Sequence, residues 1–336
     1  MKVYAPGKLI LSGEHAVVYG QPALAMAVNR YASATISREM LPQISFHLSD
    51  IAHRSRLSFG GLQHLKERIK RKYQRFIHGE YTIRQVLHKP FELAQVAMGI
   101  FADSLNLSMP HGVKIHVQSD IPIGCGMGSS AATILCVMHA VSKYLQIPIS
   151  SETLFQLALE AENLQHGQSS GLDLRVAMQG GCLYMQGKDY AARDVPAFGF
   201  YLINTGTPVS STGQCVETVA PHFKSSQLSD DFGVVTNAMD AALQKGSWQE
   251  VNQAVRENHQ LLNTIGVVPV KVQQFIKDVE LAGGAAKTCG AGAVSGENAG
   301  AVMAMVEDVA VIQSLCSRFG YEVVPVSGEN RGVHAI

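Results

Sequence analysis

Apolar and polar residues alternate along this chain with the two periods that are typical of strands and of helices. Short apolar or alternating runs predict strands at 9–11, 16–19, 24–28, 31–37, 112–117, 180–185 and 199–203. The segment 16–19 also fits a turn, and residues 38–90 are polar and irregular apart from one helical stretch. The pattern therefore predicts a fold in which strands and helices both contribute.

Helical periodicity is clearest in the longer apolar segments. The spacing predicts helices at 61–76, 91–105, 131–145, 153–165, 232–244, 248–264 and 270–282. The helix at 131–145 is apolar nearly all round, which predicts that it is buried. Ser150 is placed to cap the helix at 153–165, and Gly167 is placed to end it.

Composition narrows the class of protein. Hydrophobic residues make up 46% of the 336 residues and charged residues 16%, which predicts a folded, well-buried protein. Lys+Arg and Asp+Glu are both 27, so no basic excess points to nucleic acid. The densest basic run, 66–75, predicts a solvated helix face.

The six cysteines are scattered and none forms a CxxC pair, which argues against a zinc ribbon and fits reduced thiols. No segment has the run of about 18 apolar residues that a membrane span needs, and the N-terminus lacks a signal-peptide pattern. These features predict a soluble, cytoplasmic protein that does not act in a membrane.

A glycine-rich loop at 122–132 carries the strongest chemical signal. Gly124, Gly126 and Gly128 alternate with other residues, and Ser129-Ser130 then opens the buried helix. Glycines let the backbone approach a bulky ligand, and a helix start offers free N–H groups to an anion. A serine hydroxyl there can also bind Mg²⁺. The loop therefore predicts a phosphate site.

Two other interpretations of this loop exist. It fits a tight turn between a strand and a helix, and 126–131 formally fits the dinucleotide pattern G-x-G-x-x-A. That second pattern requires an acidic residue about 20 positions later at a strand end. Glu152 stands nearest, but at a predicted helix start. A Walker A sequence is absent, so a nucleotide loop of another kind is favoured.

Candidate catalytic groups are few in this lightly charged chain. Phosphoryl transfer needs Mg²⁺ on hard oxygens, a balancing cation and a carboxylate near the attacking hydroxyl. Ser129 or Ser130 with Glu162 could hold the metal, Asp173 could activate the hydroxyl, and Lys8 could balance charge. Each residue taken alone is more often a solvated or turn residue, so spacing leaves these roles open.

Three segments in order resemble the galactokinase, homoserine kinase, mevalonate kinase and phosphomevalonate kinase (GHMP) superfamily. They are 5–20, 122–132 and 287–292. The resemblance implies an α+β GHMP kinase fold, with an N-terminal domain like the second domain of ribosomal protein S5 and a ferredoxin-like C-terminal domain. It implies ATP in the cleft between them, and the predicted domains are 1–190 and 191–336.

The resemblance also implies roles at matching positions. Asp173 matches the catalytic aspartate and Lys8 its paired lysine, while Glu162 and Ser130, or its neighbour Ser129, match the metal ligands. The matching ATP-binding positions are Pro122, Gly124, Gly126, Met127, Gly128, Ser129, Ser130 and Ala131. The matching substrate-binding positions are Glu14, His15, Thr212, Gly290, Ala291 and Gly292.

Within the superfamily, 13–20 resembles mevalonate kinases most. This implies MgATP-dependent phosphorylation of the 5-hydroxyl of (R)-mevalonate, with a homodimer as a further expectation. Another superfamily kinase, acting on phosphomevalonate or a sugar, is the alternative, and a regulatory protein without catalysis is a second. The chain departs from the superfamily pattern at Ser169, Leu174 and the third glycine motif, and it lacks the frequent arginine before Ser211-Thr212.

Overall fold

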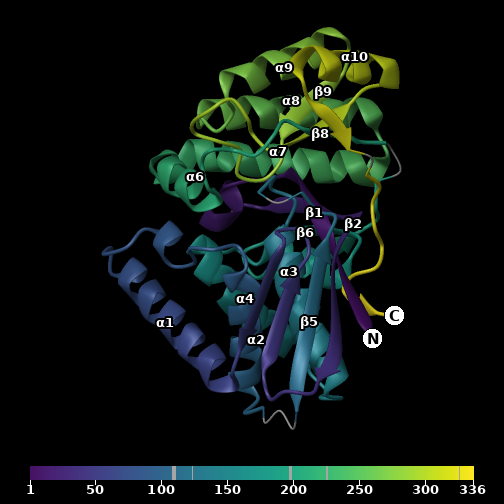
Figure 1. Ribbon diagram of the computed structural model, residues 1–336. Helices are drawn as coiled ribbons and strands as arrows, with labels where there is room; N and C mark the ends of the chain where they lie inside the picture. Colours follow the sequence, from purple (N-terminus) through teal and green to yellow (C-terminus); the bar gives the residue numbers. More distant parts are fainter. Residues whose placement is uncertain (108–110, 123, 197–198, 225, 325) are drawn as a thin grey trace.

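The computed structural model describes residues 1–107, 111–122, 124–196, 199–224, 226–324 and 326–336. A large sheet with its helices occupies the lower part of Figure 1, and a smaller sheet with its helices occupies the upper part. The strands are β1 Lys2–Ser12, β2 Ala23–Glu39, β3 Ile44–Leu48, β4 His53–Leu57, β5 Gly112–Ser119, β6 Cys182–Gln186, β7 Asp189–Arg193, β8 Tyr201–Asn204, β9 Ala285–Thr288, β10 Ala301–Met305, β11 Glu322–Val324 and β12 His334–Ala335.

The helices alternate with these strands. They are η1 Ala16–Tyr19, α1 Phe59–Ile77, η2 Ile83–Gln85, α2 Glu92–Ser104, α3 Ser129–Tyr144, α4 Ser151–His166, α5 Leu172–Gln179, α6 Thr212–Val219, η3 Ala220–Lys224, α7 Ser226–Lys245, α8 Trp248–Thr264, α9 Val270–Leu281 and α10 Val309–Phe319. The segment 16–19 is thus a 3₁₀ turn, which is one of the two forms predicted for it.

The large sheet runs in the order β12-β1-β2-β5-β3-β4, and β6 also pairs with β2. Its strands are antiparallel except for the β3–β5 pair. The predicted strands at 24–28 and 31–37 form the single long strand β2, because a register shift opposite Pro6/Gly7 absorbs the residues between them. This long strand links the β1 side of the sheet to the β5 side.

Helix α3 lies at the centre of the lower part and packs on β1 and β2, with α2 and α4 against it. Ala131, Ile134, Leu135 and Val137 in α3 are fully buried. The predicted burial of this helix is confirmed. Its first turn consequently holds the end of the glycine loop in a fixed place.

The smaller sheet runs β11-β8-β10-β9 and is antiparallel throughout. Helices α8 and α9 pack on β9, and α10 packs on α9 and β11. Phe275 of α9 stacks edge-on against Phe319 and Tyr321 at this core. The predicted helices at 248–264 and 270–282 thus cover the second sheet, while the predicted helix at 232–244 lies in α7, which packs on α8 and on β1 and β2 of the large sheet.

The basic run on α1 differs from its prediction at one residue. Lys66 is 1% exposed and pairs with Glu67 and Asp103. Its position at helical spacing from buried Leu62 and Ile69 places its stem in the core, while Arg68, Arg71 and Arg75 stay exposed. Only part of the run is therefore a solvated face.

The chain ends close to where it begins. Strand β12 pairs with β1, and the backbone N–H of Ile336 donates to the carbonyl of Lys2 at 2.9 Å. The final residues therefore join the large sheet, although the segment before them builds the small one. The domain division at residue 190 stays a prediction. No helix in the described ranges has the length and apolar character to cross a bilayer.

Candidate active site

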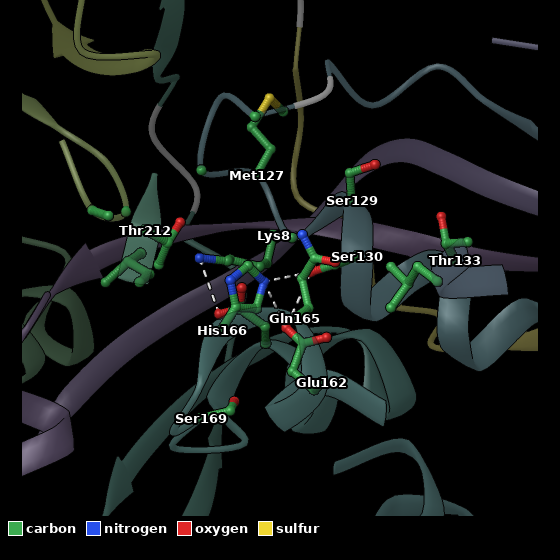
Figure 2. A pocket seen from close by; sticks show the side chains of 18 of the residues that line it. Lys8, Met127, Ser129, Ser130, Thr133, Glu162, Gln165, His166, Ser169 and Thr212 are labelled. Carbon is green, nitrogen blue, oxygen red and sulfur yellow. Dashed lines mark hydrogen bonds and ion pairs between the residues drawn. The ribbon is translucent and has the colours of Figure 1, made fainter. Parts of the chain in front are cut away.

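A cavity of about 320 Å³ is lined mainly by the part of the chain that builds the large sheet, and by Thr212, Val216, Gly290 and Ala291 from the later part. Its walls come from β1, the glycine loop, α4, the start of α5 and the turn after β9. Figure 2 shows Lys8, Ser130, Glu162 and His166 converging on one side of it, with Met127 and Thr212 on others. The volume is in the range of small-ligand sites.

The glycine loop fits between its neighbours only because Gly126 and Gly128 have no side chain. A Cβ at Gly126 would lie 2.7 Å from the carbonyl oxygen of Cys289, and one at Gly128 would lie 2.9 Å from Lys8 Cγ. Both glycines have positive φ, 78° and 73°. The loop is therefore in backbone contact with the third motif and with Lys8. Ile123, within the predicted loop, lies outside the described residues.

The start of α3 turns this loop into an anion site. The first bond within the helix runs from Ala132 N–H to the carbonyl of Gly128, so the N–H groups of Ser129, Ser130 and Ala131 have no acceptor in the helix. The partial positive charge of the helix dipole adds to these donors. Together they suit a nucleotide phosphate.

Lys8 and Asp173 form an ion pair across the cavity. The distance from Lys8 Nζ to Asp173 Oδ1 is 3.0 Å, and the two side chains are 3% and 26% exposed. Asp173 lies in the first turn of α5, where the helix N-terminus stabilises a carboxylate. The lysine is thus held rigidly, while the aspartate still reaches the cavity.

Glu162 lies beneath Ser130 on α4. Ser130 Oγ donates to Glu162 Oε1 at 3.1 Å and is 3.1 Å from His166 Nε2. Burial, and then the charge of Asp173, raise the pKa of Glu162 to about 8. Burial lowers the pKa of His166 to about 4, so its ring is neutral near pH 7.

These residues fit a magnesium ion. Glu162 Oε2 is buried and has no hydrogen-bond partner among the described residues, and such an oxygen is stabilised when a cation binds it. Mg²⁺ is usually held by one or two protein carboxylates together with substrate phosphates. Ser130 and Glu162, beside the helix start, supply oxygens of that kind.

Glu14 is paired with a residue from the other sheet. Its carboxylate forms an ion pair with Lys287 of β9, and both side chains are fully buried. Lys287 Nζ also donates to the carbonyl of Ile10 at 3.2 Å. Burial raises the pKa of Glu14, and Lys287 opposes that effect. The pair joins the first and third motifs across the molecule.

His15 is held in a strained conformation at the cavity wall. Its φ is 62°, a value that residues with side chains rarely adopt. Nε2 lies 3.1 Å from the carbonyl oxygen of Ala291 and so donates to it. Burial lowers the pKa of His15 to about 4. The neutral ring then has Nδ1 as an acceptor, which has no partner among the described residues.

The chain is similar in sequence to known proteins. Residues 92–181 match the GHMP kinases N terminal domain. A mevalonate kinase of Archaeoglobus fulgidus is 31% identical over 294 residues, which cover 86% of this chain and 88% of that enzyme. This chain belongs to the mevalonate kinase family of GHMP kinases.

Solved structures share the fold of this GHMP kinase. The mevalonate kinase of Methanococcus jannaschii has a TM-score of 0.79 at 20% identity, with 98% of each chain covered. The L. major mevalonate kinase in complex with R-mevalonate has a TM-score of 0.70 at 19% identity, covering 99% of this chain and 97% of that one. The predicted α+β GHMP kinase fold is confirmed.

Most of the predicted site residues of this GHMP kinase line the same cavity, the one described above. They are Lys8, Glu14, His15, Pro122, Gly124, Gly126, Met127, Gly128, Ser129, Ser130, Glu162, Asp173, Thr212, Gly290 and Ala291. Ala131 is buried behind the loop, and Gly292 lines a neighbouring cavity. The roles of these residues stay predictions.

Sequence reasoning gave no role to several residues at the site. Gln165 and Thr133 line the cavity (Figure 2). Arg84, from the segment 38–90 that was predicted to be irregular, lines the neighbouring cavity that also contains Gly292. Lys287 belongs to the third motif, but its pairing with Glu14 was not predicted because the two residues are 273 positions apart. Only the motif order hinted that these two residues meet.

Proposed function

We propose that this protein transfers the γ-phosphoryl group of MgATP to the 5-hydroxyl of (R)-mevalonate, giving 5-phosphomevalonate and ADP. The observation that supports this most is the Lys8–Asp173 pair at 3.0 Å, facing the glycine loop and helix start in one cavity. The A. fulgidus and L. major relatives named above support mevalonate as the acceptor.

The proposed step needs little covalent chemistry from the protein. The acceptor oxygen attacks the γ-phosphorus, the bond to the β-phosphate oxygen breaks, and the hydroxyl proton passes to Asp173. Lys8 balances the charge that spreads over the transferring group. The N–H groups at the start of α3 hold the nucleotide phosphates in line.

Ser130 and Glu162 are the proposed magnesium ligands. When bound, Mg²⁺ neutralises charge on the phosphates. Ser129 faces the same cavity and is the alternative serine ligand. Nδ1 of His15 is proposed to accept a hydrogen bond from the bound mevalonate. Thr212 is proposed to line the opposite side of the mevalonate site.

Two wider aspects belong to the same proposal. A cytoplasmic location is supported by the cysteines, which are all free and buried. A homodimer rests on the resemblance to superfamily members alone.

An acceptor panel tests the proposed function. Purified protein is assayed for ADP release with mevalonate, phosphomevalonate, homoserine and galactose, each with MgATP. The expected result is turnover with mevalonate at least 100-fold above the others in kcat/KM, since polar discrimination in a built site reaches roughly this ratio. Preference for phosphomevalonate or a sugar, or no turnover with mevalonate, would contradict it.

A further inference from the structure

A second cavity opens beside the catalytic one. It has a volume of about 410 Å³. The two cavities share the lining residues Gly124, Gly126, Gln165, His166, Thr212 and Ala291. Its remaining walls come from 83–88, 207–213 and the glycine-rich turn after β9. The two cavities therefore adjoin at these shared residues.

The charge of this second cavity differs from that of the first. The catalytic cavity is lined by Glu14, Asp50, Glu162 and Asp173. Among the described residues that line the second cavity there is no aspartate or glutamate, and Arg84 carries the one permanent charge. An anionic group in this cavity would therefore be attracted by Arg84, and no carboxylate among the described lining residues would repel it.

Arg84 is available for such a group. Its Nη2 donates to the carbonyl of Val209 at 2.9 Å, and the side chain is exposed. One carbonyl uses one of the five N–H donors of a guanidinium. By contrast, Lys8 and Lys287 are committed to Asp173 and Glu14. The bond to Val209 also fixes where the guanidinium stands, next to the loop that carries Thr212.

We propose that Arg84 binds the carboxylate of the acceptor, with the acceptor hydroxyl at Asp173 and its acidic end in the second cavity. This rests on the proposed function, because mevalonate carries its carboxylate at the opposite end of the chain from the 5-hydroxyl. Guanidinium and carboxylate match as a bidentate pair. The sequence has no arginine just before Ser211-Thr212, and Arg84 approaches that stretch from a distant segment.

The test compares two acceptors, mevalonate and its neutral amide, in which the carboxylate becomes a carboxamide. In Arg84→Gln the side chain keeps a donor for Val209 and loses the charge. The KM for mevalonate should rise roughly 10- to 100-fold, as expected for a lost charge-assisted pair. The kcat, the KM for MgATP and the kcat/KM for the amide should stay within about threefold. Arg71→Gln, on the exposed face of α1, is the matched control and should behave as wild type.

Three results would overturn the inference. Equal loss with both acceptors would make Arg84 only an anchor for the 207–213 loop, and a raised KM for MgATP would assign it to the nucleotide. An unchanged KM for mevalonate would remove it from binding. Arg84→Lys, which keeps the charge, should fall between wild type and Arg84→Gln, and thermal melting verifies that each variant folds. A wild-type protein without turnover of mevalonate would instead overturn the proposed function, and the inference with it.

Discussion

At the scale of single residues, Glu162 is a buried carboxyl group whose environment is unfavourable to its charge. It is 2% exposed, and one of its carboxylate oxygens has no partner among the described residues. Its pKa is raised from 4.5 to about 8 by burial and by Asp173. Above the ordinary pKa of glutamate, the carboxyl group ionises more readily in the unfolded chain than in the folded one. The free energy of unfolding is lowered as a result.

The variant Glu162→Gln separates the effect of this carboxyl group on stability from its proposed role in binding magnesium. Between pH 4.5 and 8 the folded wild type retains a proton that the unfolded chain loses, so its stability falls as pH rises. Without magnesium, Glu162→Gln should therefore be more stable than wild type at pH 8, and the gain should vanish near pH 4.5. Urea unfolding at several pH values measures this.

The same variant should lose magnesium-dependent turnover by roughly 100-fold or more, because it removes a carboxylate ligand. In the wild type, affinity for magnesium should fall as the pH drops below 8, since the protonated carboxyl binds metal poorly. A pH-independent stability difference would contradict the raised pKa of Glu162. Magnesium-dependent turnover close to wild type would contradict its proposed role as a metal ligand.

At the level of elements, the glycine loop and α3 carry the main constraint. Because Gly128 has no side chain, the side chain of Lys8 can pack directly against it. Gly128 is also the residue before the first turn of α3, and its own backbone is in the left-handed region. Lys8 is held a second time, through its backbone N–H, by the carbonyl of Met127 at 2.9 Å. The loop therefore positions Lys8, in addition to its proposed role in binding the nucleotide.

Gly128→Ala should displace Lys8, because the new Cβ would lie 2.9 Å from its Cγ. A displacement near 1 Å costs roughly 100-fold in rate, so kcat should fall by about that factor. Gly246→Ala is the control: its φ is 68°, and its Cβ would meet nothing within 4 Å. Steady-state kinetics on both variants measure the two values of kcat. Equal effects would mean that backbone strain, and not the contact with Lys8, limits the rate.

The elements also show what sequence periodicity can detect. The largely apolar helix α3 and the amphipathic helices α8 and α9 were predicted within a few residues. Strand β4 was missed because His53–Leu57 has one strongly apolar residue. Strand β3 was missed although Ile44, Phe46 and Leu48 alternate with polar residues, because this run is only five residues long and lies in a polar segment. Helix α5 was missed because eight residues give too few turns for a period to be visible.

At the scale of the whole molecule, the site exists because two sheets meet. Glu14 and Lys287 join them in a buried pair, and Ser12 adds hydrogen bonds to Thr236 and Asn258. Removing one partner of a buried pair typically costs about 3–5 kcal/mol. The cleft between the sheets is therefore held by specific contacts as well as by apolar packing.

The candidate site could be predicted from the sequence only in part. Lys8, Glu162 and Asp173 were found because their segments follow the superfamily order, and the structure brings them into one cavity. The Glu14–Lys287 pair and Arg84 were not assigned, because their contacts join segments more than 100 positions apart. Such contacts depend on tertiary packing, which local spacing does not encode.

The most direct test of the central claim is the turnover of mevalonate by Asp173→Asn, followed by ³¹P NMR of the product. The amide keeps the shape of the carboxylate but cannot accept the hydroxyl proton. Turnover should fall by roughly 100-fold or more, while ATP still binds at the glycine loop. Asp189→Asn, on the exposed strand β7, should form 5-phosphomevalonate at the wild-type rate. An Asp173→Asn protein within a few-fold of wild type would contradict the role of Asp173 as the acceptor of the proton.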